Sequence, residues 1–344
     1  MSGTTLEWFG ATTFRLKTRG LTIFLDTWLE KPDVLPHYLS IDQVTEADYI
    51  FISHAHFDHL PGCDRLAKQT GAIVIANGEA INTLREAGVS EDQLIPVAGG
   101  ERIPLFTKAT RLAALEDEVA TAPGPPGAPR RPEDSLATMA VHAWPSLHCV
   151  LPGKSHADIP DEMNTATRYE GSSPYACTID ITIGMRYGLL RLSELVSPEN
   201  LDQGERSFAD YVSKRDVNIM SNFDGGQIMF SFLIGEKTLL WSAHLGAYRG
   251  ILERLEPKPD VLIQAIAGRA NIDGRPYDGS AAEAATMISE LLGQPQQIIW
   301  CLHDEAPIKP WRIDTRAATS MVESKTKSRV LELTPGEAQY LFDV

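Results

Sequence analysis

The chain has 344 residues, of which 43% are hydrophobic and 22% charged, with a formal net charge of −15. This length and balance are ordinary for a soluble globular protein with a large core in one or two domains. No apolar run approaches the roughly 20 residues that cross a bilayer, and the acidic surplus disfavours binding to phosphate backbones. We therefore expect neither a membrane span nor a nucleic-acid partner.

The N-terminus and the cysteines indicate the compartment. Met1–Leu6 shows no basic region followed by an apolar stretch, so we expect no signal peptide. Cys63, Cys149, Cys177 and Cys301 are scattered without the spacing of a disulfide framework. Buried reduced thiols and a cytoplasmic location follow from this pattern.

The first strands precede the region that carries the chemistry. Residues 5–26 contain three short strand-like runs separated by glycines, which predicts a meander. Asp26 follows the third run, where it either hydrogen-bonds into a nearby site or caps the strand end. Tyr49–Ile52 is a short apolar run typical of a buried strand, and Cys63–Gln69 opens a helix.

Between these last two elements, His54, His56, Asp58 and His59 fall within six positions. Residues two apart on an extended chain point to the same side, so His54 and His56 can offer two imidazoles to one metal ion. If the chain then bends, Asp58 and His59 can turn toward a second ion. Imidazole and carboxylate together suit zinc, and also iron or manganese. The competing interpretation, a histidine-rich surface turn without metal, is much less typical of such a pattern directly after a strand.

Strand and helix patterns continue to alternate after this cluster. Their rhythm is that of βαβ units, which predicts a layered sheet covered by outer helices. The expected elements are a strand at Ala72–Ala76, a helix at Gly78–Ala87, and strands at Leu94–Val97 and Glu101–Phe106.

The segment His54-Ala-His56-Phe-Asp58-His59 resembles the HxHxDH motif of the metallo-β-lactamase superfamily of metallohydrolases. Leu6–Phe14 and Leu21–Asp26 are similar to the opening strands of its lactonase-like and phosphodiesterase-like branches. A further branch of this superfamily carries out hydrolytic dehalogenation. The resemblance implies an α/β fold, a four-layer αββα sandwich, in a single domain that spans residues 1–344.

Residues 1–150 and 226–344 would each supply one sheet of this sandwich, and two inserted regions interrupt the resemblance. Residues 110–135 include the proline- and glycine-rich stretch Thr121–Pro132, which predicts an exposed loop inside the domain. Residues 151–225 predict short helices over the edge of a sheet. They would form either a cap over the metal cleft or a contact in a homodimer.

A histidine follows the strand predicted at Leu136–Trp144. By resemblance to the family's second motif, His148 would complete a three-histidine set with His54 and His56 around the first metal ion. Without those two residues, a lone histidine with ordinary hydrogen bonds would be the favoured interpretation of His148.

The predicted hairpin Gln227–Trp241 leads to Ser242-Ala-His244-Leu-Gly246. The family usually has an aspartate here, whose carboxylate bridges two metal ions. An imidazole cannot bridge two ions in this way, although His244 can bind one. A single-metal site, or a bridge of hydroxide alone, therefore becomes an alternative. Asp224 is a less favoured candidate for the missing carboxylate.

The last motif lies near the C-terminus. The helix predicted at Ser280–Leu292 has an apolar stripe typical of core packing, and the strand predicted at Gln297–Leu302 ends at His303. By resemblance, His303 would bind the second metal ion with Asp58 and His59. Asp304 and Glu305 would either support these ligands through hydrogen bonds or lie in an exposed loop. We expect a final edge strand at Val330–Leu333.

The sequence therefore predicts a zinc-dependent hydrolase that acts on a small-molecule substrate such as an ester or lactone. Zinc lowers the pKa of bound water from about 16 to about 7, which makes hydroxide available at neutral pH. Asp58 is the candidate that orients this nucleophile and accepts its proton. We expect two zinc ions, with one ion or another transition metal as the alternative. The alternative functions are a phosphodiesterase or dehalogenase of the same superfamily, an iron-binding redox protein, or a noncatalytic binding protein.

Overall fold

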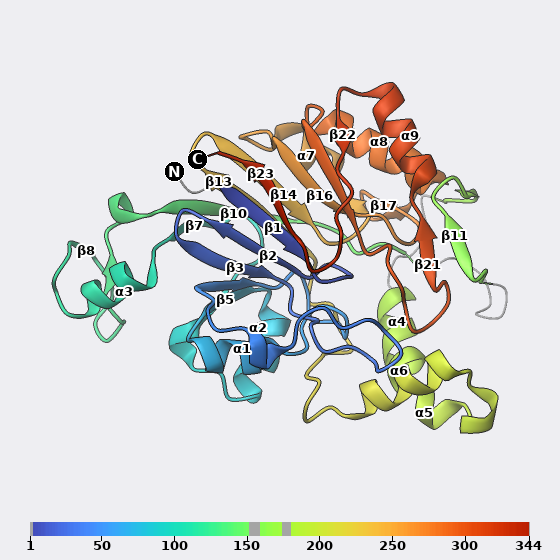
Figure 1. Ribbon diagram of the computed structural model, residues 1–344, viewed down its shortest axis with the longest axis horizontal. Coiled ribbons are helices and arrows are strands. Elements are labelled where there is room, and N and C mark those ends of the chain that lie inside the picture. Colours follow the sequence, from blue (N-terminus) through green and yellow to red (C-terminus); the bar gives the residue numbers. More distant parts are fainter. Residues whose placement is uncertain (1–2, 151–158, 174–179, 344) are drawn as a thin grey trace.

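The computed structural model describes residues 3–150, 159–173 and 180–343, and two seven-stranded sheets form its centre (Figure 1). The first sheet has the strand order β23-β1-β2-β3-β4-β5-β6. Its strands are β1 (Thr4–Trp8), β2 (Phe14–Thr18), β3 (Leu21–Leu25), β4 (Tyr49–Phe51), β5 (Ile73–Ala76), β6 (Leu94–Pro96) and β23 (Ala338–Phe342). The predicted opening meander is β1, β2 and β3, which pair antiparallel.

The second sheet has the order β22-β20-β16-β14-β13-β10-β7. Its strands are β7 (Arg102–Leu105), β10 (Met139–Pro145), β13 (Ile228–Ile234), β14 (Lys237–Ser242), β16 (Val261–Ala265), β20 (Gln297–Cys301) and β22 (Arg329–Val330). The strands β13 and β14 form the predicted hairpin, while β14, β16 and β20 run parallel to one another.

Apolar side chains between the two sheets form the largest core of the described residues. The alternation of buried and half-buried residues along β1 and β2 turns one face of each strand toward this core. The ring of Phe51 on β4 lies edge-on between Phe230 and Phe232 on β13, with both ring centroids 5.0 Å away. Because β4 and β13 belong to different sheets, these aromatic contacts hold the two sheets together.

Helices cover the outer face of each sheet. On the first sheet, α1 (Cys63–Thr70) and α2 (Gly78–Glu86) bury Leu66 and Leu84 against the strands. On the second sheet lie α7 (Arg249–Arg254), α8 (Ala281–Leu291) and α9 (Arg316–Lys325). The helix α8 begins at a capping box of Ser280 and Glu283, and its buried face is rich in alanine, which lets it pack closely. The predicted αββα sandwich is confirmed.

The division of the chain between the sheets differs from the expectation in two places. The strands β7 and β10 come from residues 1–150 but belong to the second sheet. Gly99 and Gly100 precede β7 with φ values of 102° and 113°, and this left-handed turn carries the chain from one sheet to the other. The C-terminal prediction was also wrong, because β22 has only two residues and the chain then returns to pair β23 with β1.

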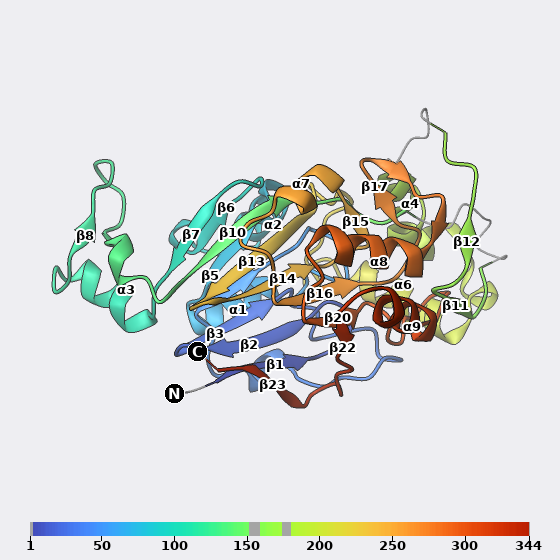
Figure 2. The same ribbon diagram turned by 90° about the horizontal axis from the view of Figure 1, so that it is seen from above.

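The two inserted regions project from opposite ends of the sandwich (Figure 2). Residues 108–115 form the helix α3 (Lys108–Leu115) instead of the start of a loop, because Thr107 caps it and its residues are good helix formers. The rest of residues 110–135 includes a two-stranded ribbon of β8 (Thr121–Ala122) and β9 (Arg131–Pro132).

At the other end, residues 159–173 and 180–225 contain the expected short helices. The helices are α4 (Asp180–Tyr187), α5 (Leu192–Leu195) and α6 (Gln203–Ser213). Short strands tie this region to the C-terminal half, since β11 (Glu162–Asn164) pairs with β21 (Arg312–Asp314) and β12 (Arg168–Tyr169) with β19 (Gly279–Ser280). A three-stranded ribbon nearby consists of β15 (Gly246–Ala247), β17 (Asn271–Ile272) and β18 (Arg275–Pro276).

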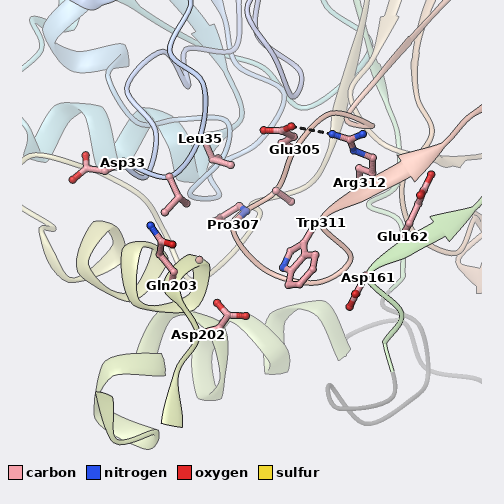
Figure 3. A pocket seen from close by; sticks show the side chains of 13 residues that line it. Asp33, Leu35, Asp161, Glu162, Asp202, Gln203, Glu305, Pro307, Trp311 and Arg312 are labelled. Atoms are coloured by element: carbon pink, nitrogen blue, oxygen red, sulfur yellow. Dashed lines mark hydrogen bonds and ion pairs between the residues drawn. The ribbon is translucent and has the colours of Figure 1, made fainter. Parts of the chain in front are cut away.

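A wide surface pocket of about 990 Å³ lies where α6 meets the C-terminal loops (Figure 3). Its wall carries five acidic residues, and Glu305 accepts a hydrogen bond of 2.9 Å from Arg312. The acidic residues are Asp33, Asp161, Glu162, Asp202 and Glu305. This pocket contains none of the candidate metal ligands.

Two remaining expectations concern thiols and membranes. Cys63 and Cys301 are fully buried free thiols, Cys149 is also buried, and Cys177 lies outside the described residues. Burial raises the pKa of both Cys63 and Cys301 well above the ordinary value, so these thiols stay protonated and unreactive. In the part of the chain that the structure describes, we find no helix with the length and apolarity that a membrane crossing requires.

Candidate metal centre

Histidines from three separate strand ends meet at one edge of the sandwich. His54 and His56 follow β4, His148 follows β10, and His244 follows β14. Their exposed fractions are at most 8%. Ligands in α/β sheets bind beyond the carboxyl ends of strands, and this cluster lies there.

The ring positions bring three of these histidines to one point. The ring centroids of His148 and His244 are 3.6 Å apart, and those of His54 and His244 are 4.8 Å apart. One ligand atom from each of His54, His148 and His244 lies within 4.8 Å of the other two. The fold thus brings together His54 and His244, which are 190 positions apart in the chain.

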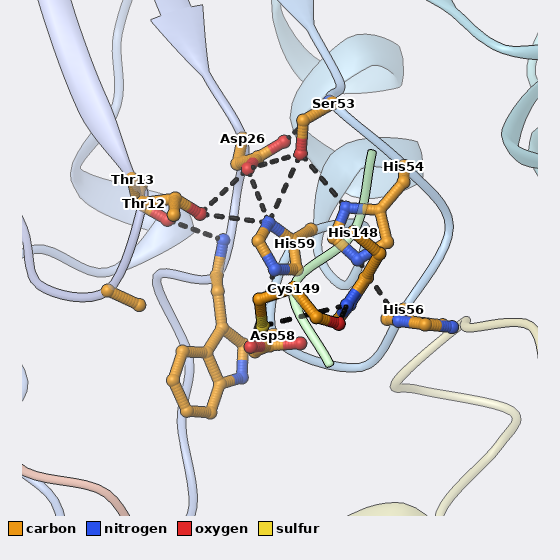
Figure 4. Close-up of polar contacts among 12 residues, drawn as sticks. Thr12, Thr13, Asp26, Ser53, His54, His56, Asp58, His59, His148 and Cys149 are labelled. Carbon is orange, nitrogen blue, oxygen red and sulfur yellow. Dashed lines mark hydrogen bonds and ion pairs between the residues drawn. The ribbon is translucent and has the colours of Figure 1, made fainter. Parts of the chain in front are cut away.

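His56 joins the same cluster through His54 (Figure 4). Its Nδ1 lies 3.1 Å from Nε2 of His54, and its ring is 5.1 Å from that of His148. Two nitrogens at this separation fit one ion with metal–nitrogen bonds of about 2.0–2.1 Å. We therefore place His54, His56, His148 and His244 in one cluster, called the histidine cluster below.

Buried nitrogen atoms without partners indicate that the histidine cluster suits a cation. Both ring nitrogens of His244, and Nε2 of His56, are buried and have no hydrogen-bond partner. Leaving such an atom unsatisfied costs about 1–3 kcal/mol, and a metal ion bound to that atom removes the cost. Burial lowers the pKa of His54, His56 and His244 well below the ordinary value, which keeps these rings in the neutral form that binds metal.

Asp26 hydrogen-bonds into the site, one of the two alternatives for this residue. Its Oδ2 lies 2.6 Å from Nδ1 of His59, and it accepts hydrogen bonds from Thr12 Oγ1 at 2.7 Å and Ser53 Oγ at 2.9 Å (Figure 4). Its left-handed backbone, with φ of 49°, turns the carboxylate inward at the end of β3. Thr12 and Ser53 are not predicted from the sequence as members of the site, although Ser53 directly precedes the motif.

His59 lies between two carboxylates. Its Nε2 is 3.3 Å from Oδ2 of Asp58, while its Nδ1 faces Asp26. Burial lowers the pKa of His59, but Asp58 and Asp26 outweigh burial and raise it to about 10. Burial alone would raise the pKa of Asp58, yet His59 holds it below its usual 3.8. Asp58 is the most exposed member of the motif, with 16% of its side chain accessible.

His303 does not join the histidine cluster. Its ring stacks on Trp8 at a centroid distance of 5.0 Å and an angle of 10°. Leu302 adopts a left-handed conformation with φ of 57° and donates a backbone hydrogen bond to Ala11, so the chain turns directly after β20. As a result, Leu302 faces the cavity beside the metal centre, and His303 lines a different pocket.

The side chains of Asp304, Glu305 and Asp224, which the sequence suggests as possible members of the site, all have other partners. Asp304 accepts hydrogen bonds of 2.9 and 3.0 Å from the backbone N–H of Ala11, and Glu305 pairs with Arg312. Asp224 accepts one from the backbone N–H of Gly226 at 3.1 Å.

Close backbone packing explains why His148 and His244 meet. A Cβ at Gly246 would lie 2.0 Å from the carbonyl oxygen of Leu147, so only glycine lets these two segments touch. The side chains of Asn271 and Gln264 donate to the carbonyl oxygens of His148 and His244, both at 2.9 Å. These contacts therefore fix the backbone at both histidines independently of any ion.

A cavity of about 210 Å³ opens onto the histidine cluster. Asp58, His148 and His244 line it, together with Ile181 and Met185 of α4, which belong to residues 151–225. Most of the remaining wall is apolar. It includes Ala11, Trp28, Phe57, Val150, Met163, Leu189, Leu302, Ile308 and Ile313.

Comparison with known proteins gives partial matches in sequence. The model of the β-lactamase superfamily domain matches residues 22–142. The chain is 37% identical over 91 residues to a UPF0173 metal-dependent hydrolase of Anaeromyxobacter sp. (strain K), covering 26% of this chain and 33% of that protein. A UPF0173 metal-dependent hydrolase of Rubrobacter xylanophilus is 34% identical over 104 residues, covering 30% and 42%. The match thus spans less than half the length of these curated relatives.

Solved structures match along nearly the whole chain. Igni18, a metallo hydrolase of Ignicoccus hospitalis, superposes with a TM-score of 0.55 at 17% identity, covering 99% of both chains. An isothiocyanate hydrolase from Delia radicum gut bacteria gives 0.52 at 11% identity, covering 99% and 100%. CmlA, a diiron β-hydroxylase from Streptomyces venezuelae, gives 0.52 at 14% identity, covering 99% and 55%. At these identities the similarity is one of fold.

Proposed function

Because this chain has the fold and the histidine motif of the metallo-β-lactamase superfamily, we propose that it is a metal-dependent hydrolase of a small neutral ester or lactone. The observation that carries this proposal is the histidine cluster, buried and yet open to a cavity large enough for a small molecule. A neutral imidazole donor set supports a transition metal, and zinc is the ion we propose.

The residues of the site divide the work of hydrolysis between them. His54, His56, His148 and His244 would hold the metal. A bound divalent ion supplies an acidic water, with its pKa lowered to about 7, and polarises the substrate carbonyl. Asp58 borders the cavity, and its lowered pKa keeps the carboxylate ionised at neutral pH, so it can accept the proton of the attacking water. His59 and Asp26 keep Asp58 oriented.

The walls of the cavity favour a neutral substrate. Lys309 is the one basic side chain among the lining residues that the structure describes, and it pairs with Asp161 at 2.6 Å. Apart from the metal ion, a phosphodiester or carboxylate substrate would therefore meet no unpaired basic side chain among these lining residues. The apolar side chains of Phe57, Ile181 and Met185 instead support an ester or lactone with a hydrocarbon group.

We also propose a cytoplasmic location. Buried reduced thiols such as Cys63 and Cys301 are typical of proteins that stay in a reducing compartment.

The test is hydrolysis of three substrate classes by the purified protein: a neutral aryl ester, a γ-lactone and bis(4-nitrophenyl) phosphate. We expect activity on the first or second, and a loss of about 10²-fold or more in His148→Ala, because metal catalysis contributes several kcal/mol. His142→Ala is the matched control, since His142 lies on β10, the strand before His148, but contacts Trp144 and Arg102. Equal activity of His148→Ala and wild type would refute the proposal.

A further inference from the structure

We infer that this centre binds one metal ion per chain, with His244 as a ligand, and that Asp58 and His59 do not hold a second ion. The inference rests on the proposed metal dependence and specifies the ligand set. Two features of the described residues carry it: the position of His244, and the surroundings of Asp58.

The first feature is the place of His244 within the histidine cluster. Its ring lies 3.6 Å from that of His148, 4.8 Å from that of His54 and 5.2 Å from that of His59. Its backbone is anchored, because Ser242 and Gln264 both donate to its carbonyl oxygen, at 3.2 and 2.9 Å. A carboxylate at such a central position could bind two ions through its two oxygens. The two nitrogens of an imidazole point in divergent directions, so His244 serves one ion at this point.

The second feature is the position of His303, the expected third ligand beside Asp58 and His59, which lines a different pocket. Protein zinc sites use at least three protein ligands. The cavity wall includes Ala11, Trp28 and Leu302, none of which can bind a metal ion through its side chain.

The residue expected to supply the third ligand is turned away. The backbone N–H of Leu302 donates to the carbonyl oxygen of Ala11 at 3.0 Å, which fixes the turn that sends His303 to Trp8. Asp304, the next carboxylate, is held by the backbone N–H of Ala11. Of the three ligands expected for a second ion, Asp58 and His59 alone remain in place among the described residues.

A consequence follows for Asp58. If no second ion occupies its oxygens, the carboxylate stays available to accept a proton at the mouth of the cavity. A dinuclear site would instead use Asp58 as a ligand.

The experiment counts metal ions on the full-length protein. After chelation and dialysis, the protein is titrated with Co²⁺, followed by its visible d–d absorption, and with Zn²⁺, followed by elemental analysis. We expect saturation at one equivalent of each ion. A second absorption phase, or two zinc ions per chain after dialysis, would overturn the inference.

Two variants locate the ion. His244→Gln keeps a side chain of similar size, and we expect at least a tenfold weaker Co²⁺ affinity with an altered absorption spectrum. His303→Ala is the matched control and should bind one ion with wild-type affinity. Unchanged Co²⁺ binding by His244→Gln, or a lost ion in His303→Ala, would each contradict the inference. Circular dichroism of both variants checks that they are folded.

The metal count and the proposed function can fail separately. One bound ion without hydrolysis of any tested ester, lactone or phosphodiester supports the inference and overturns the hydrolase proposal. Hydrolysis by a protein with two bound ions supports the hydrolase proposal and overturns the inference of a single ion. A chain that binds no ion overturns both.

Discussion

Oδ2 of Asp26 lies 2.6 Å from Nδ1 of His59, and neither side chain is accessible to solvent. This contact joins the end of β3 to the motif after β4. Because Nε2 of His59 then faces Asp58, the three residues form a chain from the core to the cavity. Asp26 is therefore a positioning residue, which acts on the substrate only through His59 and Asp58.

The substitution Asp26→Asn tests this role. A hydrogen bond to a charged group contributes about 1.5–3 kcal/mol, so we expect kcat/KM to fall about 10- to 100-fold, mainly through kcat. The metal content should stay at one ion per chain, which separates positioning from ligation. Asp42→Asn, at an exposed aspartate, is the control and should keep wild-type kinetics. A changed KM with an unchanged kcat would contradict the role of Asp26.

The helix α4, which lines the cavity, gives a second prediction, on substrate size. Met185 is 5% exposed and lines the cavity, whereas Ile183 on the same helix is 51% exposed. Met185→Trp should fill part of the cavity of about 210 Å³. We expect kcat/KM to fall about tenfold or more for a long-chain aryl ester, and less for the corresponding aryl acetate. Ile183→Trp should leave both rates unchanged. If the two variants behave alike, α4 does not shape the substrate site.

How far the sequence predicts this molecule depends on the range of the contacts involved. The motif His54–His59 and the strand before it are local, and their pattern indicates a metal site without the fold. The placement of His148 and His244 at strand ends follows from strand patterns and the family resemblance. Their meeting depends on Gly246, whose close approach to Leu147 no local pattern reveals.

His303 illustrates the opposite case. Whether residue 302 or 303 faces the site depends on the left-handed turn at Leu302, which a hydrogen bond to Ala11 fixes from the other end of the chain. The strand β23 was missed for a similar reason, because its partner β1 lies more than 300 residues away. Within residues 110–135, the proline-rich stretch concealed the helix α3, which ends before the first proline.

Contacts between the sheets give a prediction on stability. Phe51 is fully buried between Phe230 and Phe232, so Phe51→Ala should lower the free energy of unfolding by about 3–5 kcal/mol. Phe223→Ala removes the same atoms from a ring that is 43% exposed, and should cost about 0.5 kcal/mol or less. Urea denaturation of both variants measures the difference. Equal losses would mean that Phe51 does not join the two sheets as described.

Acid stability gives a prediction at the strand β21. Hydrogen bonds from Arg316 lower the pKa of Asp314 from 3.8 to about 2. Since the pKa is lower in the folded chain than in the unfolded one, the stabilisation is complete above pH 3.8 and is lost as the pH falls toward 2. In Asp314→Asn, the free energy of unfolding should therefore change less with pH between about 4 and about 2 than it does in wild type. If the free energy of unfolding of Asp314→Asn changed with acid pH as it does in wild type, the contribution of Asp314 would be excluded.

The most direct test of the metal-dependent mechanism is the rate of aryl ester or lactone hydrolysis before and after the metal is removed. The chelated protein should lose activity by about 10²-fold or more and recover it on addition of one equivalent of zinc, because the buried imidazoles need the ion to activate water. His54→Ala should not recover under the same conditions. Full activity in the metal-free protein, or recovery by His54→Ala, would contradict metal-dependent hydrolysis at this centre.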